Sequence, residues 1–259
     1  MRAWMHSTAF ALLIGLGACA QDGAGKPGAK APAGQAIAGA AYAAAIADAT
    51  RPQADKDRDA DRKPAEMLAF ADVKPGEKIG ELIPGGGYFS RIFAKAVGPT
   101  GKVYAISAAA QLVRFKAISD DTTHYPNIAV VNVDGAGFKS PEPLDLVWTS
   151  QNYHDLKNIP APFDINLYNK AVFDALKPGG LYIVLDHAAK PDATPDVTSK
   201  LHRIQQDVVK KEVAAAGFTF VGESNAVRNP ADPKDKPVFD PSLRGKTDQF
   251  VMKFKKPLK

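Results

Sequence analysis

The chain has 259 residues, of which 45% are hydrophobic and 24% are charged, so its composition is that of a globular protein with one domain, or one domain and a tail. This balance excludes fibrous, collagen-like and wholly disordered proteins, and the lack of any run of 18 apolar residues excludes multi-pass membrane proteins. The net charge of +5 comes from 33 basic and 28 acidic residues that are interspersed along the chain, so a nucleic-acid partner is not predicted.

The N-terminus has the features of a bacterial lipoprotein signal peptide. Arg2 supplies a positive charge, residues 9–18 form a short apolar run, and the sequence Leu-Gly-Ala-Cys ends at Cys19, the single cysteine. We therefore expect residues 1–18 to be removed and Cys19 to carry lipid. The alternative is a plain secretory signal that is cleaved at a neighbouring alanine. Either signal predicts an exported, periplasmic protein, and the lipid would be its only attachment to a membrane.

Two segments of unusual composition follow the signal. Residues 19–50 are rich in Ala, Gly and Pro and predict a flexible tether, in which residues 40–49 favour a short helix. Residues 51–66 alternate acids and bases, which is typical of a solvated helical face with ion pairs between residues i and i+4. A second hypothesis is that this charged segment is a lid over the site that follows. The globular domain is expected to span residues 51–259.

From residue 69 onward, segments typical of strands alternate with segments typical of helices. Apolar runs predict strands at residues 78–83, 102–106, 128–133, 144–149, 181–186, 218–223 and 248–254. Helical spacing predicts helices at residues 88–97, 109–118, 165–176 and 201–216, with the sequence Lys-Pro-Gly-Gly at 177–180 as a stop and Gly217 as a cap. Strands that are separated by crossover helices predict a mostly parallel sheet covered on both faces.

A glycine-rich loop follows the first predicted strand. Residues 81–88 read Glu-Leu-Ile-Pro-Gly-Gly-Gly-Tyr and lead directly into a predicted helix. Ligands of open parallel sheets bind beyond the carboxyl ends of the strands, where glycine lets the backbone come close and the helix N-terminus offers free N–H groups. The sequence therefore predicts a ligand site at this loop.

These motifs resemble those of class I S-adenosylmethionine (SAM)-dependent methyltransferases. The segment VKPGEKIGELIPGGGYFSRIFAKAVGPTGKVYAIS is similar to the first two strands of that family, and residues 128–134, 144–149 and 176–187 are similar to the third, fourth and fifth. RDADRKPAEMLAF, QNYHDL and KTDQFVMKF resemble, more narrowly, a group of exported bacterial methyltransferases. The resemblance implies an α/β, Rossmann-like fold: a seven-stranded, mostly parallel sheet whose last strand is antiparallel, with helices on both faces.

The resemblance also implies a cofactor, SAM, and the residues that bind it. These are Glu81, Pro84, Gly85, Gly86, Gly87, Tyr88, Ser107, Asp134, Gln151 and Asn152. Asp134 matches the acid that accepts a hydrogen bond from adenine. Two positions depart from the pattern, because Ile83 stands where the first glycine is usual and Ser107 where an acid usually binds the ribose hydroxyls. A neutral serine makes weaker hydrogen bonds than a carboxylate, which predicts reduced affinity for the cofactor.

Two histidines are the candidate catalytic residues. His154 and His187 follow the fourth and fifth predicted strands, so both are expected at the ligand-binding edge, where one can accept the proton of the methyl acceptor. His124 lies in a predicted loop and is expected at the surface. The two histidines and the nearby Asp155 and Asp186 have ligand types suited to a divalent metal, but their spacing is not diagnostic and no metal site is predicted.

The compartment leaves more than one function open. The first hypothesis is a SAM-dependent methyltransferase that acts on a small-molecule or envelope substrate. The alternative is a ligand-binding lipoprotein that keeps the methyltransferase fold without catalysis, because SAM is made in the cytoplasm and the chain is expected outside it. A different enzyme on the same fold is a third hypothesis. Near the site, Tyr88, Phe89, Trp148 and Tyr153 are expected either to build an apolar pocket or to belong to the core.

Overall fold

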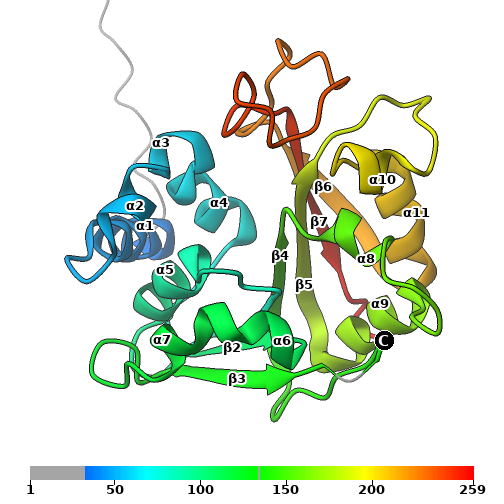
Figure 1. Ribbon diagram of the computed structural model, residues 1–259. Coiled ribbons are helices and arrows are strands. Elements are labelled where there is room, and N and C mark those ends of the chain that lie inside the picture. The colour runs from blue at the N-terminus through cyan, green and yellow to red at the C-terminus, as the bar shows by residue number, and fades with distance from the viewer. Residues whose placement is uncertain (1–32, 134) are drawn as a thin grey trace, which may run out of the picture. The chain divides into compact units, whose positions relative to one another are not determined.

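The computed structural model describes residues 33–133 and 135–259. Its centre is one sheet of seven strands in the order β3-β2-β1-β4-β5-β7-β6 (Figure 1). The strands are β1 (Lys78–Leu82), β2 (Lys102–Ser107), β3 (Ile128–Asn132), β4 (Leu144–Ser150), β5 (Leu176–His187), β6 (Thr219–Ser224) and β7 (Gln249–Lys255). The predicted signal peptide, Cys19 and Asp134 lie outside the described residues.

The pairing of the strands confirms the predicted topology. β1 pairs in parallel with β2 and β4, which places the glycine-rich loop at the middle of the sheet. β7 is antiparallel to both of its neighbours, β5 and β6. The four residues of β1 from Ile79 to Leu82 are all buried, as expected for a parallel strand covered on both faces.

Helices cover both faces of the sheet. They are α1 (Ala33–Ala47), α2 (Gln53–Lys56), α3 (Asp59–Arg62), α4 (Pro64–Ala71), α5 (Tyr88–Val97), α6 (Ala109–Leu112), the 3-10 helix η1 (Val113–Phe115), α7 (Lys116–Ser119), α8 (Tyr153–Leu156), α9 (Ile165–Ala175), α10 (Val197–Lys200) and α11 (Gln206–Ala215). One core packs α1, α4, α5 and η1 against the sheet, and the other packs α9 and α11 against its opposite face. The predicted fold is thereby confirmed.

The amphipathic pattern of α5 explains why it forms here. Phe89, Ile92, Phe93 and Val97 recur at helical spacing, and all four are buried against the sheet. The helix ends at Gly98, which has a φ of 67° and which takes this left-handed conformation without the steric cost that a side chain would add. The buried face of α5 therefore fixes the helix against the sheet, directly after the glycine-rich loop.

The folded body begins earlier than the predicted domain boundary at residue 51. α1 packs against α4 and α5, and the buried Tyr42 hydroxyl donates a hydrogen bond of 2.6 Å to the Val73 carbonyl oxygen. Tyr42 and Ala45 belong to the core. Residues 33–47 are thus part of the body and not of a tether. The alanine-rich composition hid this, since few large apolar residues mark the packed face.

Two further boundaries differ from the prediction. The sequence Lys-Pro-Gly-Gly at 177–180 lies inside β5, which pairs Leu176 with Leu144 before a register shift, and does not precede the strand as a stop. Of the helix predicted over 201–216, only α11 forms, and residues 201–205 connect α10 to it without helical structure. Between them, Ile204 forms a backbone bridge to Ala188, and this pairing at the end of β5 replaces the helical hydrogen bonds.

A long loop, residues 225–248, lies beyond the carboxyl end of β5 (Figure 1). Arg203 and Asp232 hold it in place, because both side chains are fully buried and the guanidinium Nη1 lies 2.7 Å from the carboxylate. The Arg203 Nη1 also donates to the Ala188 carbonyl oxygen at 3.1 Å. Among the helices of the described part of the chain, none is long and apolar enough to cross a membrane.

Candidate functional site

The glycine-rich loop opens onto a cavity of about 210 Å³, which we call the loop cavity. Gly85 and Gly86 line it, and a Cβ added at either residue would meet no other atom within 4 Å. Gly87 differs, because an added Cβ would lie 2.1 Å from Ile118 Cδ1 in the core. The first two glycines therefore leave room for a ligand, whereas the third is required by packing against α7.

Glu81 places a buried carboxylate at the floor of the loop cavity. It is the penultimate residue of β1, 4% of its surface is exposed, and its carboxylate accepts a hydrogen bond from Ser90. Burial raises the pKa of Glu81 to about 7, and the opposing effects of Ser90, Arg62 and Arg91 are smaller. A positively charged ligand in this cavity would favour the ionised form.

Ile83 separates the loop cavity from a smaller one. This serine cavity, of about 100 Å³, is lined by Ser107, Gln111 and Ile83 itself, among others. The Ser107 hydroxyl donates a hydrogen bond of 2.6 Å to Gln111 Oε1. Ile83 has a φ of 51°, in the left-handed region where a β-branched residue is strained. The position thus keeps the backbone conformation of a glycine although the side chain is large.

The segment after β4 forms the other wall of the loop cavity. Asn152 donates hydrogen bonds to the backbone oxygens of Ile83, at 3.0 Å, and of Ser150, at 2.7 Å. Gln151, with a φ of 61°, donates to Gln249 Oε1 at 3.0 Å and lines a second large cavity as well. Both residues therefore line the loop cavity.

The charged segment 51–66 lies over the loop cavity. Asp55, Arg58 and Arg62 line it, and the Tyr88 ring, whose centroid lies 4.3 Å from the Arg62 guanidinium carbon, joins this segment to the loop. The Tyr88 hydroxyl donates a hydrogen bond of 2.6 Å to Asp59. This is the location that the lid hypothesis requires.

A second large cavity, of about 480 Å³, adjoins the loop cavity and shares Arg58, Arg62 and Gln151 with it. Arg244, from the 225–248 loop, also lines it, so we call it the arginine cavity. Within residues 33–133 and 135–259, none of these three arginines forms an ion pair. Burial lowers the pKa of Arg62 to about 10, which leaves its guanidinium charged at neutral pH. Asp61 also lines this cavity, so three cations face one carboxylate, and the excess of positive charge favours an anionic ligand.

The two candidate histidines lie near each other but in different surroundings. Their ring centroids are 6.1 Å apart. His187 lines the arginine cavity, and burial lowers its pKa to about 4, so its ring is neutral at pH 7. Burial acts in the same direction on His154, but the carboxylates of Asp186 and Asp155 outweigh it and raise the pKa to about 10. Only His187 therefore lies where it could contact an acceptor in the arginine cavity.

The four aromatic residues divide between pocket and core. Tyr88 and Phe89 line the loop cavity. Trp148 is fully buried, with its ring centroid 4.7 Å from that of Phe89, and Tyr153 is buried on the opposite side, where its hydroxyl lies 3.0 Å from Glu212. Tyr88 and Phe89 are therefore pocket residues, whereas Trp148 and Tyr153 belong to the core.

The arginines are the residues that sequence reasoning missed. Arg58 and Arg62 are four residues apart in the charged segment, a spacing that places both on one helical face and that could have drawn attention to them. Arg244 carries no such signal, since the loop that brings it to the cavity is irregular. His202 was also left aside, although its ring centroid lies 5.5 Å from that of His154.

Comparisons with known proteins identify the family of the chain. A family model described as Protein-L-isoaspartate(D-aspartate) O-methyltransferase matches residues 49–186. The Protein-L-isoaspartate O-methyltransferase of Methanothrix thermoacetophila is 27% identical over 121 residues, which cover 46% of this chain and 52% of that protein. The chain thus spans about half the length of the curated relatives it matches.

Two solved structures share the fold. A SAM dependent methyltransferase of Aquifex aeolicus superposes with a TM-score of 0.52 at 17% identity and covers 73% of this chain and 87% of its own. The [4+2]-cyclase SpnF superposes with a TM-score of 0.58 at 14% identity and covers 87% of this chain and 95% of its own. At these identities the likeness concerns the fold alone.

Proposed function

The chain belongs to the protein-L-isoaspartate(D-aspartate) O-methyltransferase family, and from this premise we propose that it transfers a methyl group from SAM to a carboxylate. The resemblance to class I methyltransferases is confirmed at this level. The observation that carries the proposal is the arginine cavity, since its unpaired guanidinium groups adjoin the loop cavity that suits the cofactor.

The residues of the loop cavity fit SAM. The open space at Gly85 and Gly86 lets the backbone approach a ligand, and the buried Glu81 carboxylate suits a positive charge. Ser107 and Gln111 offer polar groups in the serine cavity for a ribose. Bound SAM supplies a methyl group on a positively charged sulfur.

The acceptor would be held by the arginines. Arginine binds a carboxylate with two parallel hydrogen bonds, which fixes the orientation of its oxygens as well as their position. A carboxylate is already deprotonated at neutral pH, so no base is needed to remove a proton. His187, neutral because of burial and 2.8 Å from the Thr247 hydroxyl, then acts as a polar wall of the cavity and orients the acceptor. Alignment of this kind is the main requirement of an in-line displacement.

The test combines binding and transfer. We expect S-adenosylhomocysteine to bind in calorimetry and an L-isoaspartyl peptide to take up radioactive methyl groups from SAM as an ester, which mild alkali releases as methanol. Arg244→Met should raise the KM for the peptide at least tenfold without changing the affinity for S-adenosylhomocysteine. Arg114→Met, an exposed arginine on η1, is the matched control and should change neither quantity.

Label that resists alkali would reject the carboxylate and point to a hydroxyl or amine acceptor, for which His187 is the candidate base. A small-molecule carboxylate that is labelled in place of the peptide would retain the reaction and change the substrate. A protein that binds S-adenosylhomocysteine but labels no acceptor would favour the second candidate function, a ligand-binding protein. The strained Ile83 and the neutral Ser107 are the features that favour this candidate.

We also propose that the chain is exported and attached to the cell envelope through lipid on Cys19. The support is the sequence, in which a short apolar run ends at Leu-Gly-Ala-Cys. Acyl chains gain about 0.8 kcal/mol per buried methylene, whereas polar residues gain almost nothing from a bilayer. Cys19→Ser should therefore shift the protein from the detergent phase to the aqueous phase or block its processing. Unchanged partitioning would reject the lipid anchor.

A further inference from the structure

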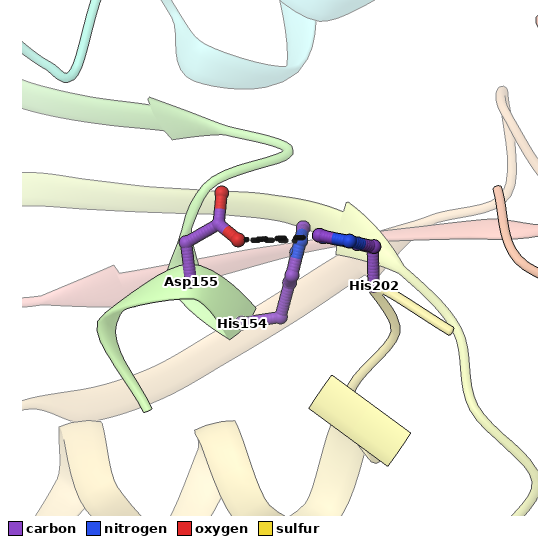
Figure 2. A group of neighbouring side chains, drawn as sticks. All are labelled: His154, Asp155 and His202. Carbon is purple, nitrogen blue, oxygen red and sulfur yellow. Dashed lines mark ion pairs between the residues drawn. The ribbon is translucent and has the colours of Figure 1, made fainter. Parts of the chain in front are cut away.

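His202 meets two consecutive residues of α8, His154 and Asp155, from which it is distant in the sequence. Figure 2 shows His154, Asp155 and His202 directed toward one another. His154 Nε2 lies 3.2 Å from Asp155 Oδ1, and His202 Nδ1 lies 3.5 Å from the same oxygen. All three ligand atoms lie within 4.8 Å of one another. We call these residues the His-Asp-His cluster.

Two distances in the cluster, both to Asp155 Oδ1, are close to those of a coordination shell. Metal–nitrogen and metal–oxygen bonds of zinc are about 2.0 to 2.2 Å long, so two ligands at a tetrahedral angle are roughly 3.3 to 3.6 Å apart. The two distances to Asp155 Oδ1 lie at or just below this range. A single ion can therefore reach all three atoms after small side-chain adjustments.

Asp186 provides the outer support that a metal-binding histidine usually has. Its Oδ1 lies 2.8 Å from His154 Nδ1, and its Oδ2 accepts a hydrogen bond of 2.7 Å from the His154 backbone N–H. Asp186 is fully buried. A carboxylate that accepts the proton of one ring nitrogen leaves the other nitrogen free to bind metal and fixes the direction of the ring. His154 Nε2 is thereby directed at Asp155 and His202.

The backbone at His202 is held in an unfavourable conformation. Its φ is 54°, which is uncommon for a residue other than glycine. The next residues, Arg203 and Ile204, are buried and hydrogen-bonded to neighbouring segments, so the strain cannot relax. This conformation presents the His202 ring to the cluster, where it also contacts Phe239 with the ring centroids 4.9 Å apart. Strain that is maintained in this way is characteristic of functional positions.

From these contacts we infer that His154 Nε2, Asp155 Oδ1 and His202 Nδ1 bind one divalent transition-metal ion, for which zinc is the best match. Two imidazoles and one carboxylate are a common donor set for zinc, and they leave a fourth position open. Asp155 is exposed and His202 is partly exposed, so water or a ligand oxygen can reach that position. The ion would tie α8 to the segment between α10 and α11.

The site would stand between two of the cavities described above. Asp155 also lines the serine cavity, and Phe239, which contacts His202, lines the arginine cavity. The inference does not depend on methyl transfer, because it rests on the geometry of the cluster alone. A metal here would position the walls of both cavities and need not take part in the chemistry.

The test is titration of the untagged, chelator-treated full chain with Zn²⁺ by calorimetry and with Co²⁺ by visible absorption. We expect one equivalent of either metal to bind and Co²⁺ to show the absorption bands of a low-coordinate site with nitrogen ligands. His202→Ala and Asp155→Ala should each weaken binding at least tenfold. His124→Ala is the matched control, since His124 is also exposed beside an aspartate, Asp121, but belongs to no such cluster within the described residues.

The inference is overturned if the wild-type chain binds no stoichiometric metal, or if His202→Ala binds metal as tightly as the wild type. In either case the cluster would be an ion pair between a protonated His154 and its two carboxylate neighbours. Near-ultraviolet circular dichroism of each variant shows whether it has kept its fold. Calorimetry of the metal-free chain with S-adenosylhomocysteine tests the proposed function separately, so the two proposals can fail independently.

Discussion

Ile83 divides the proposed cofactor region into two cavities. Its side chain lies between the loop cavity and the serine cavity, and its left-handed backbone costs about 1 to 2 kcal/mol. Ile83→Gly and Ile83→Ala should both tighten S-adenosylhomocysteine binding severalfold in calorimetry, because both remove the side chain. Only the glycine variant also removes the strain, so chemical denaturation should find it about 1 kcal/mol more stable than the alanine variant. Equal affinity in all three proteins would show that the isoleucine does not obstruct the ligand.

Gly86 and Gly87 are neighbours with opposite requirements. A side chain at Gly86 would point into open space in the loop cavity, so Gly86→Val should abolish S-adenosylhomocysteine binding while the melting temperature changes little. A Cβ at Gly87 would collide with Ile118, so Gly87→Ala should destabilise the fold by about 1 to 3 kcal/mol. Calorimetry and thermal unfolding of both variants check this contrast. A Gly86→Val protein that binds as tightly as the wild type would place the ligand elsewhere.

Glu81 should make stability depend on pH in an unusual direction. Burial raises its pKa from 4.5 to about 7 in the folded state, although Ser90, Arg62 and Arg91 act against this. Between these two values the folded chain holds a proton that the unfolded chain has lost, so the free energy of unfolding should fall as the pH rises through this interval. Above about pH 7 this loss is complete.

The matched variant for this effect is Glu81→Gln, which can still accept the Ser90 hydrogen bond. Urea unfolding at a series of pH values should show that the wild type loses stability relative to the glutamine variant between pH 4.5 and about 7. Parallel pH profiles for the two proteins would show that Glu81 does not titrate in this range.

At the scale of elements, two carboxylates hold α2 and α3 beside the loop cavity: Asp55, which lies 2.7 Å from Arg91 on α5, and Asp59. Asp59 accepts hydrogen bonds from the buried Arg51, at 2.6 and 2.9 Å, and from the Tyr88 hydroxyl, at 2.6 Å. Asp59→Ala would leave the Arg51 guanidinium without its charged partner, with the Ile46 carbonyl oxygen as its remaining acceptor, and should cost roughly 1 to 3 kcal/mol. Hydrogen exchange of the amides in residues 51–62 should become faster, whereas the exchange rates in the core strands should change less.

Asp174→Ala is the control for this prediction. Asp174 pairs with Lys170 on the exposed face of α9, and an exposed pair of this kind contributes at most about 1 kcal/mol. Its removal should leave exchange in residues 51–62 unchanged. If Asp59→Ala also leaves that exchange unchanged, the two helices are held by other contacts and Asp59 has no special role.

Local patterns predicted most elements because the pattern and the final packing agree there. α5 has the same bounds in prediction and structure, since its apolar stripe matches the face that it buries. The prediction failed where tertiary pairing replaces the local preference. Residues 201–205 have helical spacing, but Ile204 pairs with the end of β5, and residues 177–180 contain a proline and two glycines yet continue β5.

The candidate site also has one part that local patterns predicted and one part that they did not. The loop after β1 was predictable because a strand, three glycines and a helix are contiguous in the sequence. The arginine cavity was not, since Arg244 reaches Arg58 and Arg62 only through a loop whose path is set by the buried pair of Arg203 and Asp232. No pattern in one stretch of sequence reports a contact of that kind.

For the molecule as a whole, this buried pair should be among the costliest to break. Both side chains are fully buried, so Asp232→Ala would leave the Arg203 charge uncompensated at a cost of roughly 3 to 5 kcal/mol. Urea denaturation measures this loss, and Asp174→Ala again serves as the exposed control. A cost below about 1 kcal/mol would mean that water reaches Arg203 in the variant and that the loop is free to move.

The antiparallel β7 has a consequence for the order of folding. It lies between β5 and β6 and follows every other described strand in the chain, so β6 has no partner in the sheet until residues 249–255 are available. A chain leaving the ribosome can assemble the five strands from β1 to β5. Until β7 inserts, however, β6 must not pair with the open edge of β5. During that interval the apolar residues that later contact Val251 and Met252 are exposed. This part of the sheet therefore stays open until β7 pairs with both of its neighbours.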